Sequence, residues 1–527
     1  MAFAQVVYEP EFKTSYNFLS RMAQRGIISL DDVVLPLSRK YIQEKLSEVY
    51  FRYKELTLLE NKELDFYLKD YLLDRISIDT MHSGSLPPIL FKKKINDRWR
   101  FVAYRNKDFT INLQPIIGTQ LDLRQGETVF KRSSGFWLYG YIHKNFGYSF
   151  SFNEISENGP LVDFKKSFTP EPGFFGIASP GTTNYSDFRT NLSYNWKWGT
   201  ISTGREKTQW GYGANGKVVL SNKAPAYPFV RLDVKPATWL SFNMTAMWLS
   251  SGVVDSAYVR PTTVAMQTQI DFVPKYLSTH SFTFMASKKL SFSIGESIIF
   301  NNRLKLGYLI PLAFWRAQSH YDGENGGGTN TLSNSQFFLQ ASSRNHLPNT
   351  HLYFNFFVDE MSFKKFFDKA LMRNQTGYCA GLSVTNIPFK NGYFQTDYTR
   401  TRPYNYVHFV PAQTYTNREY NLGHWIGPNA DQWYSAYTYQ FIRGLKGQIT
   451  FNTVRAGTVG KGFGQQYERG TQFLWGSINR YNTLASNFTY EITHDVFLKG
   501  SLAYQQTLIN NALDKYFHYS VALNISL

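Results

Sequence analysis

The chain has 527 residues, of which 17% are Phe, Trp or Tyr, and its mean hydropathy is −0.35. A soluble protein would need several cores, with linkers and helical segments throughout, to bury so many aromatic rings, and neither occurs after about residue 97. The net charge of +17 is scattered along the chain and forms no basic stripe with stacking rings, which disfavours nucleic acid and favours acidic glycans or lipopolysaccharide phosphates as partners.

A closed antiparallel barrel in a membrane accounts for the aromatic content and the low hydropathy together. Its strands alternate apolar residues facing lipid with polar residues facing the interior, and its aromatic residues gather at the two interfaces.

Residues 1–5 resemble the end of a processed secretory signal. Ala2-Phe3-Ala4 before Gln5 has the small-residue pattern of a cleavage site, so we interpret residues 1–5 as a remnant of a signal peptide. An ordinary N-terminus is the alternative.

Residues 15–76 have helical periodicity. Apolar residues recur at helical spacing, with Glu, Lys and Asp between them, at Ile42, Leu46, Val49 and Tyr53, and at Leu64, Leu68, Tyr71 and Leu72. The pattern predicts two or three short amphipathic helices, and we expect residues 6–86 to form a periplasmic helical segment that plugs or caps a barrel. A separate soluble helical domain is disfavoured because residues 77–97 contain no long flexible linker.

The sequence pattern of residues 87–527 predicts an all-β antiparallel transmembrane barrel. Apolar and polar residues alternate with a period of two in runs that begin near Phe109, Leu240, Leu290, Leu304, Leu352, Trp433, Leu498 and Phe517. No run of about 18 apolar residues occurs, so a closed barrel is the remaining structure that can span a bilayer. A soluble β-sandwich or β-helix would alternate in the same way, but loops of very unequal length favour the barrel. Glu296 lies on the apolar face of the Leu290 run, and the pattern does not explain it.

The connections differ in length on the two sides of the predicted barrel. Working back from the C-terminus, which is periplasmic in such barrels, places the turns at 236–238, 388–392 and 494–495 in the periplasm. The long connections are expected outside the cell, at about 154–187, 207–227, 313–332, 358–375 and 402–431. The strand count from the runs alone is 18 to 22, and it must be even.

A Gly- and Pro-rich stretch, 204–229, lies between two of the predicted strands. Its glycines permit backbone turns closed to other residues and its prolines end strand pairing, so we interpret it as a structural loop folded into the lumen, with Arg205 and Glu206 paired there. A ligand-contacting constriction is the alternative. The residues assigned to this structural loop are Gly204, Arg205, Trp210, Gly211, Gly213, Gly216, Ser221 and Pro225.

Four segments resemble the Wzi capsule-assembly family of outer-membrane barrels, particularly its Bacteroidetes members. They are GREKTQWGYGANGKVVLSNKAPAYPFVRL (204–232), PLSRKYIQEKL (36–46), LYFNFFVDEM (352–361) and TRTRPYNYVHFVPAQTYTNREYNLGHWIGPNAD (399–431). The resemblance implies an eighteen-stranded barrel with a periplasmic helical bundle, acting as a surface lectin that holds capsular or exopolysaccharide on the cell. We therefore expect about 18 strands, within a range of 16 to 22. Gliding-associated barrels are also similar, so a gliding- or secretion-associated role is an alternative.

The connection 402–431 is the predicted glycan site. Its aromatic rings can stack on the apolar faces of sugars, and its Arg and His side chains can donate to hydroxyls or carboxylates. An aromatic belt at the membrane interface is the alternative. The predicted residues are Arg402, Tyr404, Tyr406, His408, Tyr415, Arg418, Tyr420, His424 and Trp425, with Trp315, Arg316, His320 and Tyr321 as a smaller second wall.

The residues give little support to catalysis, metal binding or open transport. His494-Asp495 falls on the periplasmic side, Asp359-Glu360 is more typical of a structural or ion-binding pair, and Cys379 alone fits no disulfide or metal site. We expect no enzyme, metal or cofactor. A passive porin is the transport alternative, but helices at one mouth and Gly-rich, aromatic loops at the other suggest a closed lumen. The expected partners are capsular or extracellular polysaccharide, the lipid bilayer and lipopolysaccharide.

Overall fold

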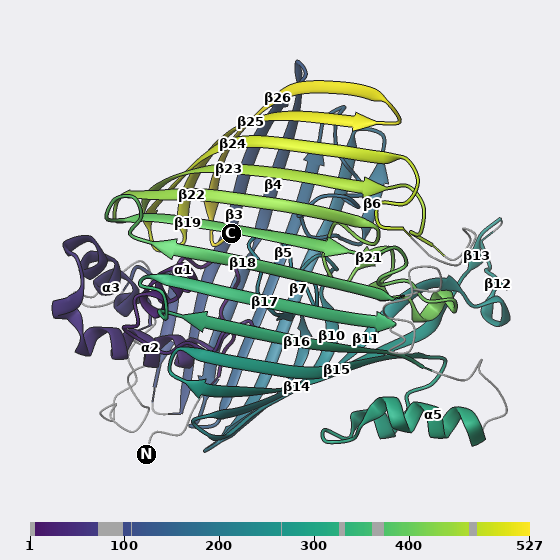
Figure 1. Ribbon diagram of the computed structural model, residues 1–527, viewed down its shortest axis with the longest axis horizontal. Helices are drawn as coiled ribbons and strands as arrows, with labels where there is room; N and C mark the ends of the chain where they lie inside the picture. The colour runs from purple at the N-terminus through teal and green to yellow at the C-terminus, as the bar shows by residue number, and fades with distance from the viewer. Residues whose placement is uncertain are drawn as a thin grey trace.

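The computed structural model describes residues 6–71, 98–106, 108–264, 266–325, 333–360, 374–462 and 472–527. Within these residues, eighteen antiparallel strands form a closed barrel, which confirms the predicted fold class and strand number (Figure 1). In order around the wall they are β3 (Phe109–Arg124), β4 (Glu127–Ile142), β5 (Phe146–Asn158), β7 (Thr182–Trp196), β8 (Gly199–Glu206), β10 (Tyr227–Ala237), β11 (Leu240–Val254), β14 (Phe272–Ser287), β15 (Leu290–Asn301), β16 (Asn334–Arg344), β17 (Thr350–Glu360), β18 (Gln375–Thr385), β19 (Gly392–Thr401), β22 (Ala430–Ile442), β23 (Leu445–Gly457), β24 (Ile478–Thr493), β25 (Val496–Ile509) and β26 (Ala512–Ile525).

The barrel closes between its first and last strands. β26 pairs with residues 117–124 of β3, and the short strand β2 (Val102–Arg105) pairs with residues 110–113 farther along the same edge. Because the ladder is continuous, the wall has no open edge, and its backbone groups are paired between neighbouring strands, as a lipid surrounding requires.

Side chains alternate between the two faces of the wall, as the period of two predicts. On β26, Val521 is 60% exposed on the outside, whereas its neighbour Ala522 is 5% exposed. On β3, Thr110, Asn112 and Gln114 are buried on the inside. No helix in the described part of the chain has both the length and the apolar character needed to cross a membrane.

The run 304–310 is not a strand, and this prediction was wrong. β15 ends at Asn301, and Asn302 turns the chain away with a φ of 70°. The short helix η4 (Leu306–Leu309) follows, with Tyr308 buried against the outer face of the barrel. A period of two cannot separate a strand from a loop whose alternate residues pack on a surface.

The two ends of the barrel have different connections. One end, called the turn end, has only short connections, among them 238–239, 288–289 and 494–495. The opposite end, called the loop end, has the long ones: 159–181, 207–226, 255–271, 302–333, 361–374, 402–429 and 458–477. The sequence had not indicated the connections 255–271 and 458–477.

Shorter elements lie within these connections and in the N-terminal segment. They are β1 (Val34–Leu35), η1 (Tyr53–Glu55), β6 (Gly176–Ser179), β9 (Gln209–Trp210), η3 (Ser256–Tyr258), β12 (Arg260–Pro261), β13 (Thr268–Gln269), α5 (Trp315–Asn325), η7 (Pro411–Gln413), β20 (Thr416–Asn417) and β21 (Tyr420–Asn421).

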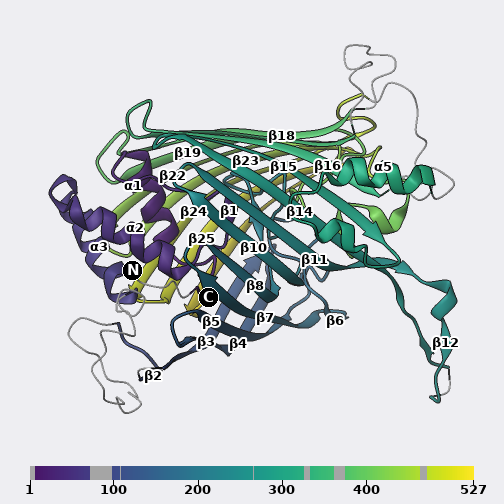
Figure 2. The same ribbon diagram turned by 90° about the horizontal axis from the view of Figure 1, so that it is seen from below.

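Three helices lie together at the turn end, which confirms the prediction of two or three short helices (Figures 1 and 2, purple). They are α1 (Ser15–Gln24), α2 (Arg39–Phe51) and α3 (Leu58–Asp70). Ser38 caps α2 by accepting the Tyr41 N–H at 3.1 Å, and Thr57 and Glu60 cap α3 reciprocally. The apolar faces form one small core with Phe18, Leu19, Met22, Ile42, Leu46, Val49, Leu64 and Tyr67.

A buried charge cluster joins the helices to the barrel. The Lys13 ammonium lies 3.1 Å from a carboxylate oxygen of Asp70 and 2.7 Å from one of Asp495, in the turn between β24 and β25. The Arg98 guanidinium lies 2.9 Å and 2.6 Å from the same two carboxylates. All four side chains are 5% exposed or less. Each buried charge depends on its opposite partners, so the cluster holds the helices and the barrel as one unit.

Further contacts tie the helical segment to other parts of the wall. Arg344, on β16, holds the Asp32 carboxylate with two bonds of 2.8 and 2.9 Å. The Thr14 hydroxyl donates to Glu491 on β24 at 2.7 Å. The expected domain boundary between residues 86 and 87, and the residues 1–5 interpreted as a signal remnant, lie outside the described residues, so these divisions stay predictions.

Asp70→Asn should loosen the helical segment. The change takes one carboxylate away from three buried cations, because Arg39 also lies 3.6 Å from Asp70, and disrupting such a cluster costs about 3–5 kcal/mol. Limited proteolysis should then remove the helices while the barrel still shifts on heating in gel electrophoresis. Asp65→Asn, an exposed position on the same helix, is the matched control. Equal protease resistance of the two variants would contradict the role of the cluster.

Acid should loosen the same contact. Burial alone would raise the pKa values of Asp70 and Asp495, but the Arg98 and Lys13 cations outweigh it and hold both pKa values below their ordinary range. Burial raises the pKa of Glu9. Protonation of this one carboxyl therefore opposes the loss of stability that protonation of Asp70 and Asp495 causes. A carboxyl whose pKa is lowered in the folded protein contributes stability that is fully present above about pH 4. This stability is lost as the pH falls through the pKa of the folded state. Hydrogen exchange in α3, after correction for intrinsic rates, should rise as the pH falls below about 6.5, because burial lowers the pKa of His494, whose ring stacks on Phe66 of α3, to about 4. It should rise further below about pH 4, where Asp70 and Asp495 are protonated.

Candidate functional site

Two loop-end connections fold into the barrel and interlock. The Tyr406 and Tyr415 hydroxyls donate to the carbonyls of Val218 and Val219 at 2.7 and 2.9 Å. The Ser221 hydroxyl donates to the Gly423 carbonyl at 2.6 Å, and further bonds run between the same segments. Connections 207–226 and 402–429 therefore form one body, which we call the plug.

The plug is bonded to inward-facing polar side chains of the wall. Asn355 of β17 accepts the Tyr212 N–H and donates to the Tyr212 carbonyl, both at 2.9 Å. Asp397 of β19 accepts the Ala214 N–H at 2.6 Å, and the Lys275 ammonium of β14 donates to the Thr416 carbonyl at 2.6 Å. On the side of the plug that faces the turn end, β9 of the plug pairs with β1 of the helical segment. The plug thus fills the side of the barrel formed by β14 to β19.

Most of the predicted glycan-binding rings lie inside the plug. Tyr406, Tyr415 and Tyr420 are at most 2% exposed and share a core with Trp210 and Phe357. Tyr404 is also buried. Rings packed on all sides cannot stack on a sugar in this conformation, so their present role is to hold the plug together.

The basic residues of the same connection lie in different surroundings. Burial lowers the pKa of His424 to about 3 and that of His408 to about 4, so both are neutral at physiological pH. Arg402 is half-buried, and its backbone N–H donates to the Thr376 carbonyl at 3.0 Å. Arg418 is exposed, with its guanidinium 4.1 Å from the ring centroid of Phe175.

The predicted second wall is not beside the plug. Trp315, Arg316, His320 and Tyr321 all belong to α5, which lies outside the barrel (Figures 1 and 2). Trp315 is buried against outward-facing residues of β11, β14 and β15. The structure therefore separates these four residues from connection 402–429.

The residues assigned to a structural loop line the plug and its edge. A Cβ on Gly216, whose φ is +141°, would lie 2.4 Å from the His424 ring, so this contact between the two connections requires glycine. Trp210 is fully buried, and the Pro225 carbonyl accepts from Asn417 at 3.3 Å. Gly204, Gly211, Gly213 and Ser221 lie in the same stretch, on β8 or in the plug.

The expected pair of Arg205 and Glu206 does not form. Adjacent strand residues point to opposite faces, and Glu206 points inward and lies 3.2 Å from the Arg189 guanidinium of β7. Arg205 lies on the other face of β8.

A cavity remains at the loop end, on the side of the barrel opposite the plug's wall contacts. Its volume is about 540 Å³, within the range of small-ligand sites. It lies between the connection 159–181 and the inner faces of β3, β4 and β23 to β26. Its lining combines rings with hydrogen-bonding and charged groups: Phe168, Trp425, Tyr481, Tyr516, Gln120, Asp122, Arg124, Lys131, Asn452, Glu157, Asp163, Lys166, Asn482, Gln505, Thr507, Asp514 and His518.

The aromatic rings of this cavity come from several elements, and their neighbours hold them in place. Trp425, on the plug, donates through its indole N–H to the Asn215 carbonyl at 2.6 Å. Phe168 lies 5.3 Å from Trp425 and 4.9 Å from Tyr481, between ring centroids. The Tyr516 hydroxyl donates to Gln505 at 2.6 Å, and the Arg124 guanidinium lies 5.6 Å from the Tyr516 ring centroid. Side-chain hydrogen bonds and ring contacts thus fix the aromatic groups beside polar ones.

An ion-pair network forms the floor of the cavity. The Glu157 carboxylate lies 3.0 Å from Lys131 and 2.8 Å from Lys166, and Lys166 lies 2.6 Å from Glu171. A second cavity of about 590 Å³ lies deeper and shares Gln120, Lys131 and Glu171 with the first. The network therefore separates two adjoining cavities.

A single lysine of the plug holds the connection 159–181 next to this ion-pair network. The Lys223 ammonium donates to the carbonyls of Thr169 and Glu171 at 2.9 and 2.8 Å, and also to the Lys166 carbonyl. Three backbone carbonyls on one cation fix the position of Phe168 in the cavity wall.

Of the predicted glycan residues, Trp425 alone lines this cavity. The sequence reasoning missed Phe168, Tyr481, Tyr516 and their polar neighbours because it sought the site within one connection. A signal was present on β25 and β26, where the inward positions carry Gln505, Thr507, Tyr516 and His518 while most outward positions are apolar.

The acidic and His pairs weighed as catalytic have structural partners. His494 stacks on Phe66 at 3.7 Å, and Asp495 belongs to the buried charge cluster. Asp359 accepts the Tyr406 N–H at 2.8 Å. The side chain of Glu360 lies outside the description, and within the described residues no group of three or more His, Cys, Asp or Glu side chains could hold a metal ion.

Solved structures that resemble this chain include a capsule assembly protein and, at lower TM-scores, two other bacterial proteins. Wzi of Escherichia coli, described as an outer-membrane protein involved in group 1 capsule assembly and as a carbohydrate-binding β-barrel, has a TM-score of 0.59 and 12% identity, with 99% of this chain and 100% of that chain covered. OprD of Pseudomonas aeruginosa has a TM-score of 0.41 and 10% identity over 79% of this chain and 93% of its own. OccAB2 of Acinetobacter baumannii has a TM-score of 0.44 and 10% identity over 79% of this chain and 97% of its own.

A search of curated protein sequences finds no match. The sequence profile of the family described as capsule assembly protein Wzi matches residues 92–517, which is most of the chain. The chain belongs to the Wzi family of capsule assembly proteins, whose outer-membrane β-barrel it shares.

Proposed function

We propose that this protein binds capsular or extracellular polysaccharide at the cell surface and that the loop-end cavity is its binding site. The observation that carries the proposal is the cavity lining, which places Phe168, Trp425, Tyr481 and Tyr516 beside charged and amide groups. Aromatic faces stack on the apolar faces of sugar rings, while the polar groups bond their hydroxyls. Family membership supports the same function, because the E. coli relative is described as carbohydrate-binding. A closer relation to Bacteroidetes members of the family stays a prediction.

We propose an orientation with the helices in the periplasm and the loop end outside the cell. Barrels of the bacterial outer membrane have short periplasmic turns and longer outer loops, and this chain has that asymmetry. The cavity then opens toward the surface, where a polysaccharide would be held. The preference for an acidic polymer rests on the net charge of +17, because carboxylates outnumber Lys and Arg side chains in the cavity lining itself. The apolar outer wall would contact lipid and lipopolysaccharide.

We propose binding without chemical change. The carboxylates around the cavity all have partners. Glu157 lies beside Lys131 and Lys166, and Asp122 lies 3.2 Å from His518. Asp163 accepts the backbone N–H groups of Lys165 and Lys166, and Asp514 accepts from the Gln125 amide. A passive porin is disfavoured because the plug and the helical segment occupy the interior. A gliding- or secretion-associated role would not require the cavity to bind sugar, so the experiment below separates it from capsule attachment.

Tyr516→Ala and Trp425→Ala should each weaken polysaccharide binding. Loss of one stacking ring corresponds to about 1 kcal/mol, or roughly fivefold in affinity. The measurement is retention of the cell's own polysaccharide by detergent-solubilised protein and by cells with equal barrel levels. Tyr519→Ala, on the outward face of the same strand as Tyr516, is the matched control. Retention equal to that of the control in both variants would place the site elsewhere.

The plug predicts a closed barrel, which planar-bilayer recordings test. Intact protein should show no steady large conductance. Trp210→Ala removes a fully buried ring from the plug core, at a cost of about 3–5 kcal/mol, and should produce frequent channel openings. Trp433→Ala, an exposed outward ring on β22, should behave as the parent. A steady large conductance from the parent would favour the porin.

A further inference from the structure

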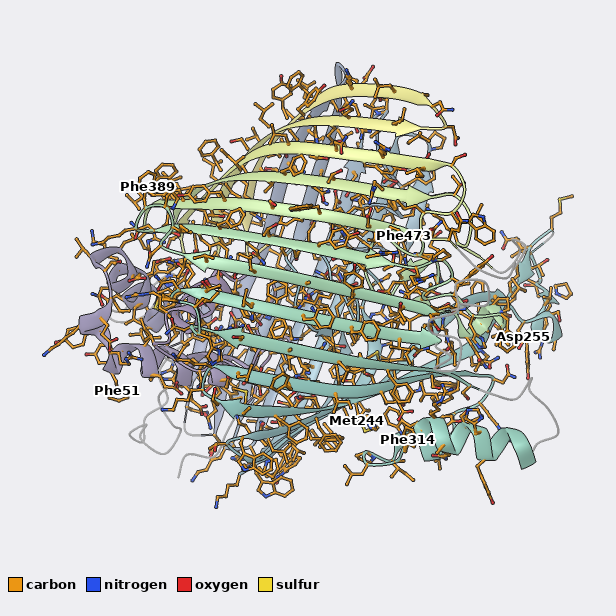
Figure 3. All side chains as sticks on the ribbon, in the orientation of Figure 1. Phe51, Met244, Asp255, Phe314, Phe389 and Phe473 are labelled. Carbon is orange, nitrogen blue, oxygen red and sulfur yellow. The ribbon has the colours of Figure 1, made fainter. Side chains whose placement is uncertain are left out.

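Residues 302–325, the described part of the connection between β15 and β16 before its gap, follow an unusual path along the outside of the barrel. Helix α5 lies outside the wall of strands (Figures 1 and 2), and Tyr308 of η4 packs on outward-facing residues of the wall. Phe314, just before α5, also lies outside the wall (Figure 3), with its ring centroid 6.0 Å from that of Phe337 on β16. The Pro311 carbonyl contacts His280, which lies midway along β14. The chain therefore descends from the loop end to about half the height of the wall before α5 begins.

Two outward-facing polar residues receive this segment. The Glu296 carboxylate of β15 accepts the backbone N–H groups of Trp315 and Arg316 at 3.1 and 2.6 Å. His280 lies opposite Glu296 in the strand register, contacts the Pro311 carbonyl through Nδ1 at 2.8 Å and stacks on Trp315 at 4.0 Å. This accounts for the carboxylate on the apolar face of β15, because Glu296 caps the first turn of α5.

Such contacts are what a hydrocarbon surrounding demands. Irregular backbone at membrane depth is tolerated only where its N–H and C=O groups are satisfied within the protein. Glu296 and His280 supply partners at the point where the segment reaches deepest, and each would be unfavourable on a bare lipid-facing wall.

The segment has an inner and an outer apolar side. On the inner side, Tyr308 and Trp315 are fully buried against Ile298 and Phe300. On the outer side, the exposed residues are Leu306, Ile310, Leu312 and Phe314, between 54% and 74% exposed. They continue the apolar outer surface that Phe292 and Ile294 form on the lower part of β15.

We propose that residues 306–314 form a re-entrant strap, lying on the barrel wall within the hydrocarbon layer with its outer apolar residues against lipid acyl chains. The polar residues Asn302, Arg303 and Lys305 precede it on the side of the loop end. Glu296 and His280 are the groups that dock it. With the loop end outside the cell, as proposed above, this is the outer leaflet, but the depth of the strap does not depend on that orientation or on polysaccharide binding.

Spin labels test the depth of the strap directly. A nitroxide on Leu312→Cys in protein reconstituted into phospholipid vesicles should be more accessible to oxygen than to a water-soluble nickel chelate. Ile294→Cys, on the wall, provides the lipid-facing reference, and Met266→Cys, fully exposed in connection 255–271, provides the aqueous one. Cys379 is buried, so the parent should take up no label. A ratio within about twofold of the Ile294 value supports the strap, and a ratio equal to the Met266 value would overturn it.

Glu296→Gln tests the docking group. The amide keeps the shape but loses the charge and one of two acceptors, so the strap should loosen, giving a more mobile spectrum at position 312 and a severalfold rise in nickel accessibility. Glu127→Gln, an exposed position at the start of β4, is the control and should leave both readouts unchanged. An unchanged spectrum in folded Glu296→Gln would refute the docking role. Polysaccharide retention should remain at the parent level, which separates this test from that of the binding site.

Discussion

Closure of the strand ladder is the constraint on which the rest of this structure depends. A wall surrounded by lipid cannot leave backbone groups unpaired, so the first and last strands must meet, as β26 and β3 do. Closure creates an interior lined by the polar half of every alternating strand. That interior then decides where the loops, the helices and the binding cavity can lie.

The interior is filled unevenly, and the uneven filling produces the cavity. The plug bonds to inward residues of β14 to β19, where Lys275, Asn355 and Asp397 meet its backbone. On the opposite side, residues 161–171 of the connection 159–181 line the cavity, held by Lys223 and by the ion pairs of Lys166. The aromatic load that would be excessive in a soluble protein is divided between the outer surface, the plug core and the rings of this cavity.

The fold could be predicted because local patterns carry it. The period of two predicted the barrel, and the helical spacing of apolar residues predicted the helices. The resemblance added the strand number. The alternating run 304–310 misled because a loop packed on a surface can imitate a strand.

The site was harder to predict, because its position depends on contacts between distant segments. Connection 402–431 carries the rings and donors of a sugar site, but Val218 and Val219 occupy the hydroxyls of Tyr406 and Tyr415. The cavity takes Phe168 from one connection, Trp425 from another and Tyr516 from the last strand, and no local spacing links these three. Glu296 appeared anomalous for the same reason, since its partners are backbone groups of a segment that follows it in the chain.

The most direct test of the central claim is hydrogen–deuterium exchange of the intact protein in lipid nanodiscs, with and without the cell's purified polysaccharide. Binding in the loop-end cavity should slow exchange in residues 161–171 and near Trp425, the backbone that lines the cavity outside the stable strand ladder. Exchange in the helices at the turn end should not change. An absence of protection in 161–171 at saturating polysaccharide, or protection confined to the connection 255–271, would contradict the account.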